Sequence, residues 1–406
     1  MQPDTPLHIH MGTSKIIGIF FMVCAFLLGA NILFAKNHSF SKEIANFFAT
    51  DNYASQIQIL NTLLDKHGAL AIQEAVHKYS PSTMKNTHIF LHHIGEYLYQ
   101  TEGEKGIFDC KNYYLLGCKH GFIESLMSKK GIEGIIHLLD IVSSSSNLTP
   151  NERMQIAHGI GHGLENYYKY DLTRSLTACD ELGPLLPTAS PYWCYYGVFM
   201  ENAMSHIYDG IPIGIRLSKD QSPLSPCKDL SKRYHFACFT NQPRLMNWLF
   251  DKNFDKVILT CNTVRESSDR TACFQGISHF IVVMENTVEK NINNIVSFCN
   301  KLPQPFNSAC IVFTAQSNVW LEDYGEFPIN LCQTLTKPKE KKWCGKHLVD
   351  GIIIMAPDQN TIRNFCTQLP TELFDDRCTA LIQGKKVGLP LEYLDNATAF
   401  QNIGQW

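Results

Sequence analysis

Three residue pairs in the N-terminal half of the chain have the spacing of metal ligands on one face of a helix. The two members of each pair are four positions apart: His92 and Glu96, His120 and Glu124, and His158 and His162. Residues at i and i+4 lie on the same side of an α-helix, so each pair could direct two ligand atoms at one point. Imidazole and carboxylate ligands suit zinc, iron or manganese. These six residues are therefore candidate ligands of a transition-metal ion.

The second and third pairs lie in matching segments. The segment Cys118–Glu124 reads CKHGFIE and the segment Ile156–His162 reads IAHGIGH, so both place His-Gly one turn before a second polar residue. If the two segments are successive units of a repeat, His120 and His158 occupy equivalent positions on adjacent helices. Such helices are about 10 Å apart, which is near enough for long side chains to converge.

A structural interpretation of the histidines stays open beside this one. A histidine next to a glycine can also be a hydrogen-bonded packing residue where two helices cross. Gly159, Gly161 and Gly163 each cost about 1 kcal/mol relative to alanine inside a helix. Close helix packing, or a ligand that approaches the backbone, must compensate. His88 lies one turn before His92 and fits either interpretation.

Aromatic residues follow the histidines in two groups, within residues 167–170 and 193–196. Packing in the core is the simplest role for them, and the alternative is a wall of a concave pocket. Glu201, Asn202 and His206 come next on the same predicted helix and could join such a pocket.

The elements that must position these residues are predicted by the cysteines. Fourteen of the fifteen cysteines form seven local couples, and the fifteenth, Cys24, stands apart. The second members of the last five couples recur roughly every 35 residues, which is typical of stacked helix-pair repeats. The couples are Cys110 and Cys118, Cys179 and Cys194, Cys227 and Cys238, Cys261 and Cys273, Cys299 and Cys310, Cys332 and Cys344, and Cys366 and Cys378.

Local disulfides explain these couples better than zinc sites do. Zinc sites usually pair cysteines two to four residues apart, and no C-x-x-C occurs in the chain. Disulfides persist in oxidising compartments. We therefore expect each couple to join the end of one helix to the start of the next. The predicted fold is all-α, an α-solenoid of helix-pair repeats of about 35 residues stapled by local disulfides.

An apolar segment near the N-terminus predicts a membrane anchor. Ile16–Ala35 contains no charged residue and is flanked by Lys15 and Lys36. Twenty helical residues rise about 30 Å, the thickness of the hydrocarbon core of a bilayer. We expect an uncleaved transmembrane signal-anchor. The alternative is a signal peptide cleaved after Ala35, although Leu33 fits the small-residue rule poorly.

These signals predict a single-pass membrane protein whose main domain lies outside the cytoplasm, in the periplasm or at the cell surface. The predicted organisation is a cytoplasmic tail (1–15), the anchor (16–35), N-terminal helical units with His88, His92 and His93 (36–104), histidine-bearing repeat units (105–225), and C-terminal disulfide-paired repeats with a cap (226–406).

The periodic helix pairs with local cysteine couples resemble the disulfide-bridged Sel1-like repeat proteins over residues 105–380. This resemblance implies an architecture of stacked α-helical pairs and no particular reaction. The chain departs from it, because Sel1-like repeats have closer cysteines and a consensus richer in alanine and glycine. The segments Cys118–Glu124 and His158–His162 also resemble the C-x-HG-x-x-E and HG-x-GH segments of uncharacterised extracytoplasmic prokaryotic proteins.

Composition narrows the class of function. Hydrophobic residues make up 45% of the chain, which excludes global disorder, and the net charge of −3 offers no basic field for nucleic acid. Solenoids present extended concave surfaces, so the leading expectation is a binding or scaffold protein with a protein or peptide partner on that face. The alternative is a metal-dependent enzyme whose His/Glu site lies in the N-terminal repeats.

Overall fold

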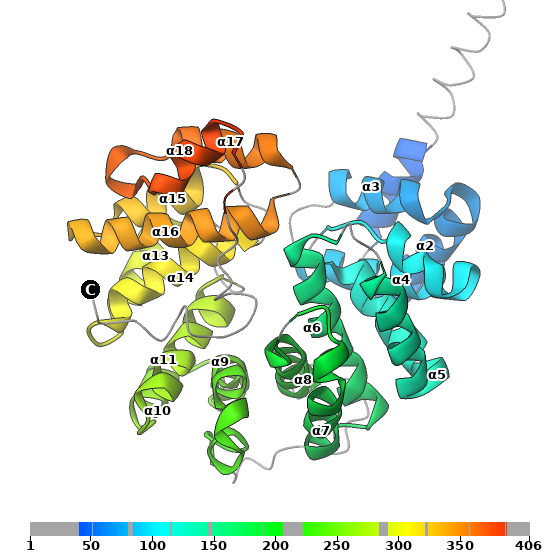
Figure 1. Cartoon of the computed structure of the whole chain (residues 1–406), viewed down its shortest axis with the longest axis horizontal. Helices are drawn as coiled ribbons and strands as arrows, with labels where there is room; N and C mark the ends of the chain where they lie inside the picture. Colours follow the sequence, from blue (N-terminus) through cyan, green and yellow to red (C-terminus); the bar gives the residue numbers. More distant parts are fainter. Residues whose placement is uncertain are drawn as a thin grey trace, which may run out of the picture. The chain divides into compact units, whose positions relative to one another are not determined.

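The computed structural model describes residues 40–50, 52–79, 84–113, 116–144, 148–188, 190–205, 222–283, 291–320, 324–356, 358–385 and 387. Over these residues the chain is helical and has no β-strand, which confirms the predicted all-α class (Figure 1). The predicted anchor, Ile16–Ala35, lies outside the described residues. Within the described part, no helix combines the length and the apolar character needed to cross a membrane.

The chain divides into two compact units, Met1–Pro81 and Ser82–Trp406. In the first unit, a helix over residues 40–49 precedes α2 (Tyr53–His67) and α3 (Ala69–Tyr79). These helices bury apolar side chains such as Leu64 and Ile72 against one another. The predicted segment 36–104 is thus divided between the units, and all the candidate ligands belong to the second.

The second unit contains the remaining helices. They are α4 (Met84–Glu102), α5 (Gly117–Ser143), α6 (Pro150–Tyr167), α7 (Leu172–Leu182), α8 (Tyr192–Ser205), α9 (Lys232–Leu249), α10 (Phe254–Asn262), α11 (Ser267–Gly276), α13 (Ile292–Cys299), α14 (Phe306–Trp320), α15 (Glu326–Gln333), α16 (Pro338–Met355), α17 (Gln359–Gln368) and α18 (Asp376–Ile382). Single helical turns or short stretches lie between them, namely η1 (Gly103–Asp109), η2 (Gly183–Leu185), η3 (Cys227–Asp229), η4 (Ile277–Val283) and η5 (Thr371–Leu373).

Local sequence signals start several of these helices. Thr149 caps α6, where its side chain and that of Glu152 satisfy each other's backbone N–H groups and Pro150 fills the first turn. Such a capping box supplies acceptors for N–H groups that have no partner within the helix. Asn253 and Asn291 cap α10 and α13 in the simpler way, with a side-chain oxygen that accepts from a backbone N–H.

The longer helices form one continuous row, in which α4, α5, α6, α8, α9, α11, α14 and α16 each contact the next. We call these eight helices the main row. The shorter helices α7, α10, α13 and α15 lie beside it, and each contacts the main-row helix that follows it in the chain. Spatial neighbours along the row are therefore not always consecutive in the sequence, because α6 packs extensively on α8 as well as on α7.

All seven predicted cysteine couples are disulfides, with Cα–Cα distances between 5.3 and 5.8 Å. These distances lie within the ordinary range for a disulfide. Each bond joins a short element to the helix that follows it, as Cys261 of α10 does with Cys273 of α11. The predicted pairing of the cysteines is confirmed, and it indicates an oxidising, extracytoplasmic compartment. The second cysteine, however, lies one to two turns inside α9, α11, α14 and α16, and not at the helix start that the sequence led us to expect.

Glycines let the backbones of main-row helices approach closely. A Cβ atom on Gly121 of α5 would lie 2.0 Å from the carbonyl oxygen of His92 on α4. The contact is reciprocal, because a Cβ atom on Gly95 of α4 would lie 1.9 Å from the carbonyl oxygen of Cys118 on α5. Only glycine fits at such crossings. The side chains next to these glycines are thereby brought to the interface between helices.

Candidate metal centre

Five histidines from three consecutive main-row helices gather in one cluster. They are His88 and His92 of α4, His120 of α5, and His158 and His162 of α6. His120 lies at the centre, with its ring centroid 5.0 to 5.7 Å from those of the other four. We call these five residues the histidine cluster.

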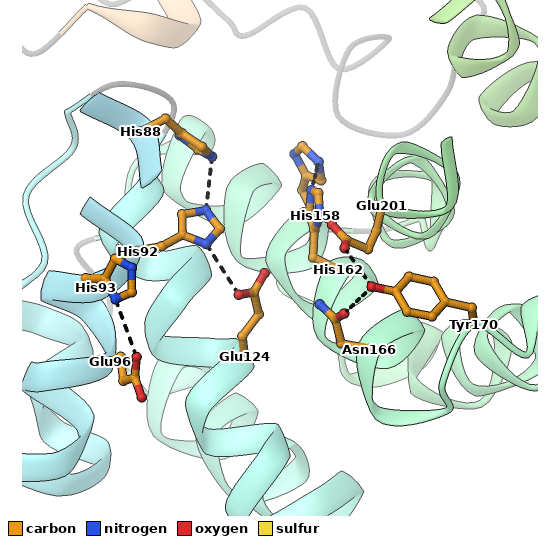
Figure 2. Close-up of polar contacts among 10 residues, drawn as sticks. All are labelled: His88, His92, His93, Glu96, Glu124, His158, His162, Asn166, Tyr170 and Glu201. Atoms are coloured by element: carbon orange, nitrogen blue, oxygen red, sulfur yellow. Dashed lines mark hydrogen bonds and ion pairs between the residues drawn. The ribbon is translucent and has the colours of Figure 1, made fainter. Parts of the chain in front are cut away.

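The first half of the cluster joins α4 to α5. The Nε2 atoms of His88 and His92 are 3.0 Å apart, and Nδ1 of His92 lies 3.3 Å from a carboxylate oxygen of Glu124 (Figure 2). The carboxylate thus reaches His92 from the neighbouring main-row helix. We call His88, His92 and Glu124 the first half-site.

The second half of the cluster repeats this arrangement between α6 and α8. The Nε2 atoms of His158 and His162 are 2.9 Å apart, and Nδ1 of His162 lies 2.8 Å from a carboxylate oxygen of Glu201 (Figure 2). The other oxygen of Glu201 lies 3.4 Å from the hydroxyl of Tyr170, which also donates to Asn166. We call His158, His162 and Glu201 the second half-site.

Close helix crossings also position the second half-site. A Cβ atom on Gly161 would lie 2.1 Å from the carbonyl oxygen of Cys194, and one on Gly197 would lie 2.1 Å from that of His158. These contacts bring α6 and α8 together beside His158. Gly159 serves a different contact, because a Cβ atom there would lie 3.0 Å from Cδ2 of His120.

His120 stands between the half-sites with one nitrogen unsatisfied. Its Nε2 atom lies 3.2 Å from the side-chain oxygen of Gln155, which also lies 3.3 Å from Nδ1 of His158. Its Nδ1 atom is buried and has no hydrogen-bond partner in the part of the chain that the structure describes. A buried polar atom without a partner costs about 1–3 kcal/mol, so such an atom calls for an explanation. The residue itself is only 1% exposed.

The ligand atoms of three histidines converge closely enough to hold one ion. One ring nitrogen from each of His88, His92 and His120 lies within 4.8 Å of the other two. These residues are buried or half-buried, so a bound ion would be partly shielded from water. Three neutral imidazoles and an open position are a common ligand set for a catalytic transition metal.

Burial and charge set the protonation states in the cluster. Burial lowers the pKa of His120 and His158 well below the usual value. Burial also opposes protonation of His92, but the charge and hydrogen bond of Glu124 outweigh it and raise the pKa of His92. Burial disfavours the ionised Glu124 carboxylate, yet the contact with His92 outweighs that cost and lowers its pKa. At neutral pH, His120 and His158 are therefore uncharged and Glu124 is ionised.

A further carboxyl group is buried behind the second half-site. Glu165 is fully buried, accepts a hydrogen bond of 2.8 Å from the side-chain amide of Asn202, and has a second oxygen without a partner. Burial raises the pKa of Glu165 to about 7. This carboxyl group is therefore partly protonated at neutral pH, unlike an ordinary glutamate.

The structure brings together five of the six candidate ligands, namely His92, His120, Glu124, His158 and His162. Glu96 lies apart from them, because its side chain is half exposed, contacts His93 at 3.7 Å and accepts a hydrogen bond from Gln100. It is one turn farther along α4 than His92, away from the crossing with Gly121. Glu124 takes the place beside His92 that Glu96 was expected to fill.

The structure also places beside the cluster some residues that the spacing rule left out of the ligand set. His88 completes the first half-site, and its spacing from His92 is a signal that the sequence does contain. Glu201 contacts His162, and Asn202 donates a hydrogen bond to Glu165. His206 lies outside the described residues. No sequence signal points to Gln155 as the link between His120 and His158.

A small cavity adjoins the cluster on the side of α8. It is lined by side chains of α8, α9, α11, η4 and α14, which include Tyr196, Gln275, His279 and Trp320. The ring of Tyr196 lies 5.5 Å from that of His158. Gln275 Oε1 and Trp320 Nε1 are buried without hydrogen-bond partners. The aromatic group at 193–196 thus contributes to a pocket wall as well as to the core.

Comparisons with protein-family models, with curated proteins and with solved structures find no match to this chain.

Proposed function

We propose that the histidine cluster binds a transition-metal ion, and that the protein is an extracytoplasmic metal-binding protein built from disulfide-stapled helix pairs. The observation that carries the proposal is the convergence of ring nitrogens from His88, His92 and His120 within 4.8 Å. An all-imidazole ligand set suits zinc or iron better than manganese, which prefers oxygen ligands.

The spacing of the two Nε2 atoms in the first half-site fits ligands of one ion. Two nitrogen ligands about 2.1 Å from a metal are about 3.0 Å apart at a right angle and about 3.4 Å apart in a tetrahedron. The Nε2 atoms of His88 and His92 are 3.0 Å apart. Two imidazole lone pairs this close repel each other unless a proton or a cation lies between them.

Glu124 has the position of a residue that orients a ligand. Its contact is with Nδ1 of His92, which leaves Nε2 of that ring free to bind a metal ion. Carboxylates commonly hold metal-binding histidines in this way, fixing the tautomer and raising the basicity of the ligand. We therefore assign Glu124 to positioning His92, in place of the direct ligation that the sequence suggests.

The unsatisfied nitrogen of His120 supports the same assignment. The Nδ1 atom is buried and lacks a partner among the described residues. A metal ion bound at the cluster would give His120 a partner for a ring nitrogen and offset the cost of burying it. The uncharged state of a deeply buried imidazole is also the state that binds metals.

A metal-dependent enzyme is favoured over a purely structural metal site by the neighbouring cavity. A bound ion with three protein ligands supplies a Lewis acid and lowers the pKa of a coordinated water to about 7. The cavity begins at Tyr196, beside His158, and Gln275 and Trp320 are among the other residues that line it.

We propose that the main row is an α-solenoid similar to the Sel1-like repeat proteins, because its helices contact one another in succession. The membrane anchor at Ile16–Ala35 and a protein or peptide partner on a concave face stay predictions from the sequence.

The test is metal binding by the full chain, produced with its disulfides formed. The apo protein should bind at least one equivalent of zinc, measured by titration and by elemental analysis after desalting. His120→Ala should weaken this binding by more than about 100-fold, because it removes a ligand and not only an orienting group. His137→Ala is the matched control, because the side chain of His137 is 63% exposed and forms an ion pair with Glu104, which is not part of the cluster. A wild-type protein that binds no zinc, or equal affinity in the wild type and the His120 variant, would overturn the proposal.

A further inference from the structure

We propose that the histidine cluster holds two transition-metal ions, one in each half-site, on either side of His120. This inference rests on the proposed metal-binding function and adds a second site, formed by His158 and His162 and oriented by Glu201. Three features of the molecule support the second site: the geometry of the second half-site, the placement of its residues on their helices, and the position of His120.

The second half-site reproduces the histidine pair and the orienting carboxylate of the first. Two histidines four positions apart place their Nε2 atoms 2.9 Å apart, compared with 3.0 Å in the first half-site. A carboxylate from the next main-row helix contacts Nδ1 of one histidine in both cases, at 2.8 Å for Glu201 and 3.3 Å for Glu124. The histidine pair and the orienting carboxylate that support an ion in the first half-site are therefore both present in the second. The convergence of three ring nitrogens within 4.8 Å is found, among the described residues, for His88, His92 and His120.

The two half-sites are not copies inherited with the repeat. His92 and His158 are equivalent positions, because the carbonyl oxygen of each faces a glycine on the next main-row helix. The partner histidine, however, precedes His92 by one turn in the first half-site and follows His158 by one turn in the second. Duplication alone would have placed the partner on the same side. The same local geometry built from two different placements is what a shared requirement for metal ligands produces.

His120 offers a third imidazole to both half-sites. Its ring centroid is 5.5 and 5.7 Å from those of His88 and His92. It is 5.0 and 5.5 Å from those of His158 and His162, so it is as near to one pair as to the other. An imidazole has two nitrogen atoms on opposite sides of its ring, and in His120 one of them has no hydrogen-bond partner among the described residues.

The number of ions in paired variants tests this inference. The apo full chain would be titrated with zinc, and the bound metal measured after desalting. We expect two equivalents in the wild type. The double variant His158→Ala, His162→Ala should lose one equivalent and keep the other, and the double variant His88→Ala, His92→Ala should do the same. Circular dichroism of each variant would confirm that the helices are intact.

The outcome separates this inference from the function on which it rests. A single equivalent in the wild type, which depends on His88 and His92 but not on His158 and His162, would overturn the second site and leave the proposed function standing. No bound zinc in the wild type would overturn both. Two equivalents that remain in the His158 and His162 variant would overturn the assignment of these residues.

A milder pair of variants covers the case in which the alanine variants fail to fold. Glu201→Gln keeps the shape of the side chain but removes the charge that orients His162, and Glu124→Gln does the same for His92. Loss of an orienting carboxylate typically weakens metal affinity by about 10- to 100-fold. Each variant should weaken one of the two binding events and leave the other unchanged. Equal weakening of both events by Glu201→Gln would contradict two separate half-sites.

Discussion

Gly161→Ala should destabilise the protein, although alanine is the better helix former. Relative to glycine, alanine favours an interior helical position by about 1 kcal/mol. At this position, however, the added Cβ would lie 2.1 Å from the carbonyl oxygen of Cys194 and 2.7 Å from the backbone nitrogen of Val198. Both obstacles are backbone atoms of α8, and Cys194 is further held by its disulfide with Cys179. A change of rotamer cannot relieve the overlap.

Gly163→Ala on the same helix is the matched control. The nearest atom to a Cβ there is the terminal methyl of Met127, at 3.2 Å, and that flexible side chain can move aside. This variant should keep most of the gain in helix propensity. In Gly161→Ala, α8 must withdraw by about 1 Å, and overpacking of this kind costs about 1–3 kcal/mol or more. We expect the two variants to differ in unfolding free energy by about 2–3 kcal/mol, with Gly161→Ala below the wild type.

The assay is denaturant unfolding of both variants and the wild type under oxidising conditions, followed by circular dichroism. Withdrawal of α8 would also separate Glu201 from His162, so Gly161→Ala should weaken zinc binding at the second half-site while Gly163→Ala does not. The reasoning is refuted if Gly161→Ala is as stable as Gly163→Ala, because α6 and α8 would then not be in backbone contact.

Three further predictions concern other parts of the chain. Because burial raises the pKa of Glu165 to about 7, the free energy of unfolding should fall by up to about 3 kcal/mol as the pH rises from the ordinary glutamate pKa to 7. Urea titrations at pH 5 and pH 8 should show this fall in the wild type and not in Glu165→Gln. Lys119→Ala should lower the free energy of unfolding by about 3 kcal/mol, since Lys119 is 2% exposed and its Nζ donates to Glu152 at 2.8 Å. Lys130→Ala, at the more exposed pair with Glu104, should lower it little in the same assay. Mass mapping without reductant should find seven bonds within couples and at most Cys24 as a free thiol; bonds between couples would contradict the stapled helix pairs.

Features that depend on local spacing could be predicted from the sequence. The two cysteines of each couple are 8 to 15 positions apart, and this short separation allows their pairing to be predicted. The start of α6 could also be predicted, since Thr149, Pro150 and Glu152 cap the helix through local contacts alone. Likewise, the spacing of His158 and His162 places them on one helix face whatever the helix packs against.

Contacts between helices could not be predicted in the same way. Glu96 and Glu124 both follow a histidine by four positions, and spacing alone gives them equal standing. What distinguishes them is the crossing of α4 and α5 at Gly121, which points Glu124 at His92 and leaves Glu96 near the surface. The contact between Glu201 and His162 was harder still to predict, because the two residues are 39 positions apart. They meet where α6 packs on α8, which is not the next helix in the sequence.

Equivalent positions of the repeat connect the histidine cluster to the cavity beside it. The position two residues after the second cysteine of a couple is His120 in α5 and Tyr196 in α8, and in α9 and α11 it is Thr240 and Gln275. Tyr196, Thr240 and Gln275 all line the cavity, and the ring of His158 bridges His120 to Tyr196 at 5.0 and 5.5 Å. One structural position of the repeat therefore carries imidazole at the cluster and then aromatic, hydroxyl and amide groups along the cavity. A molecule bound in the cavity would therefore lie along the same row of positions as the proposed ions, next to the ring of Tyr196.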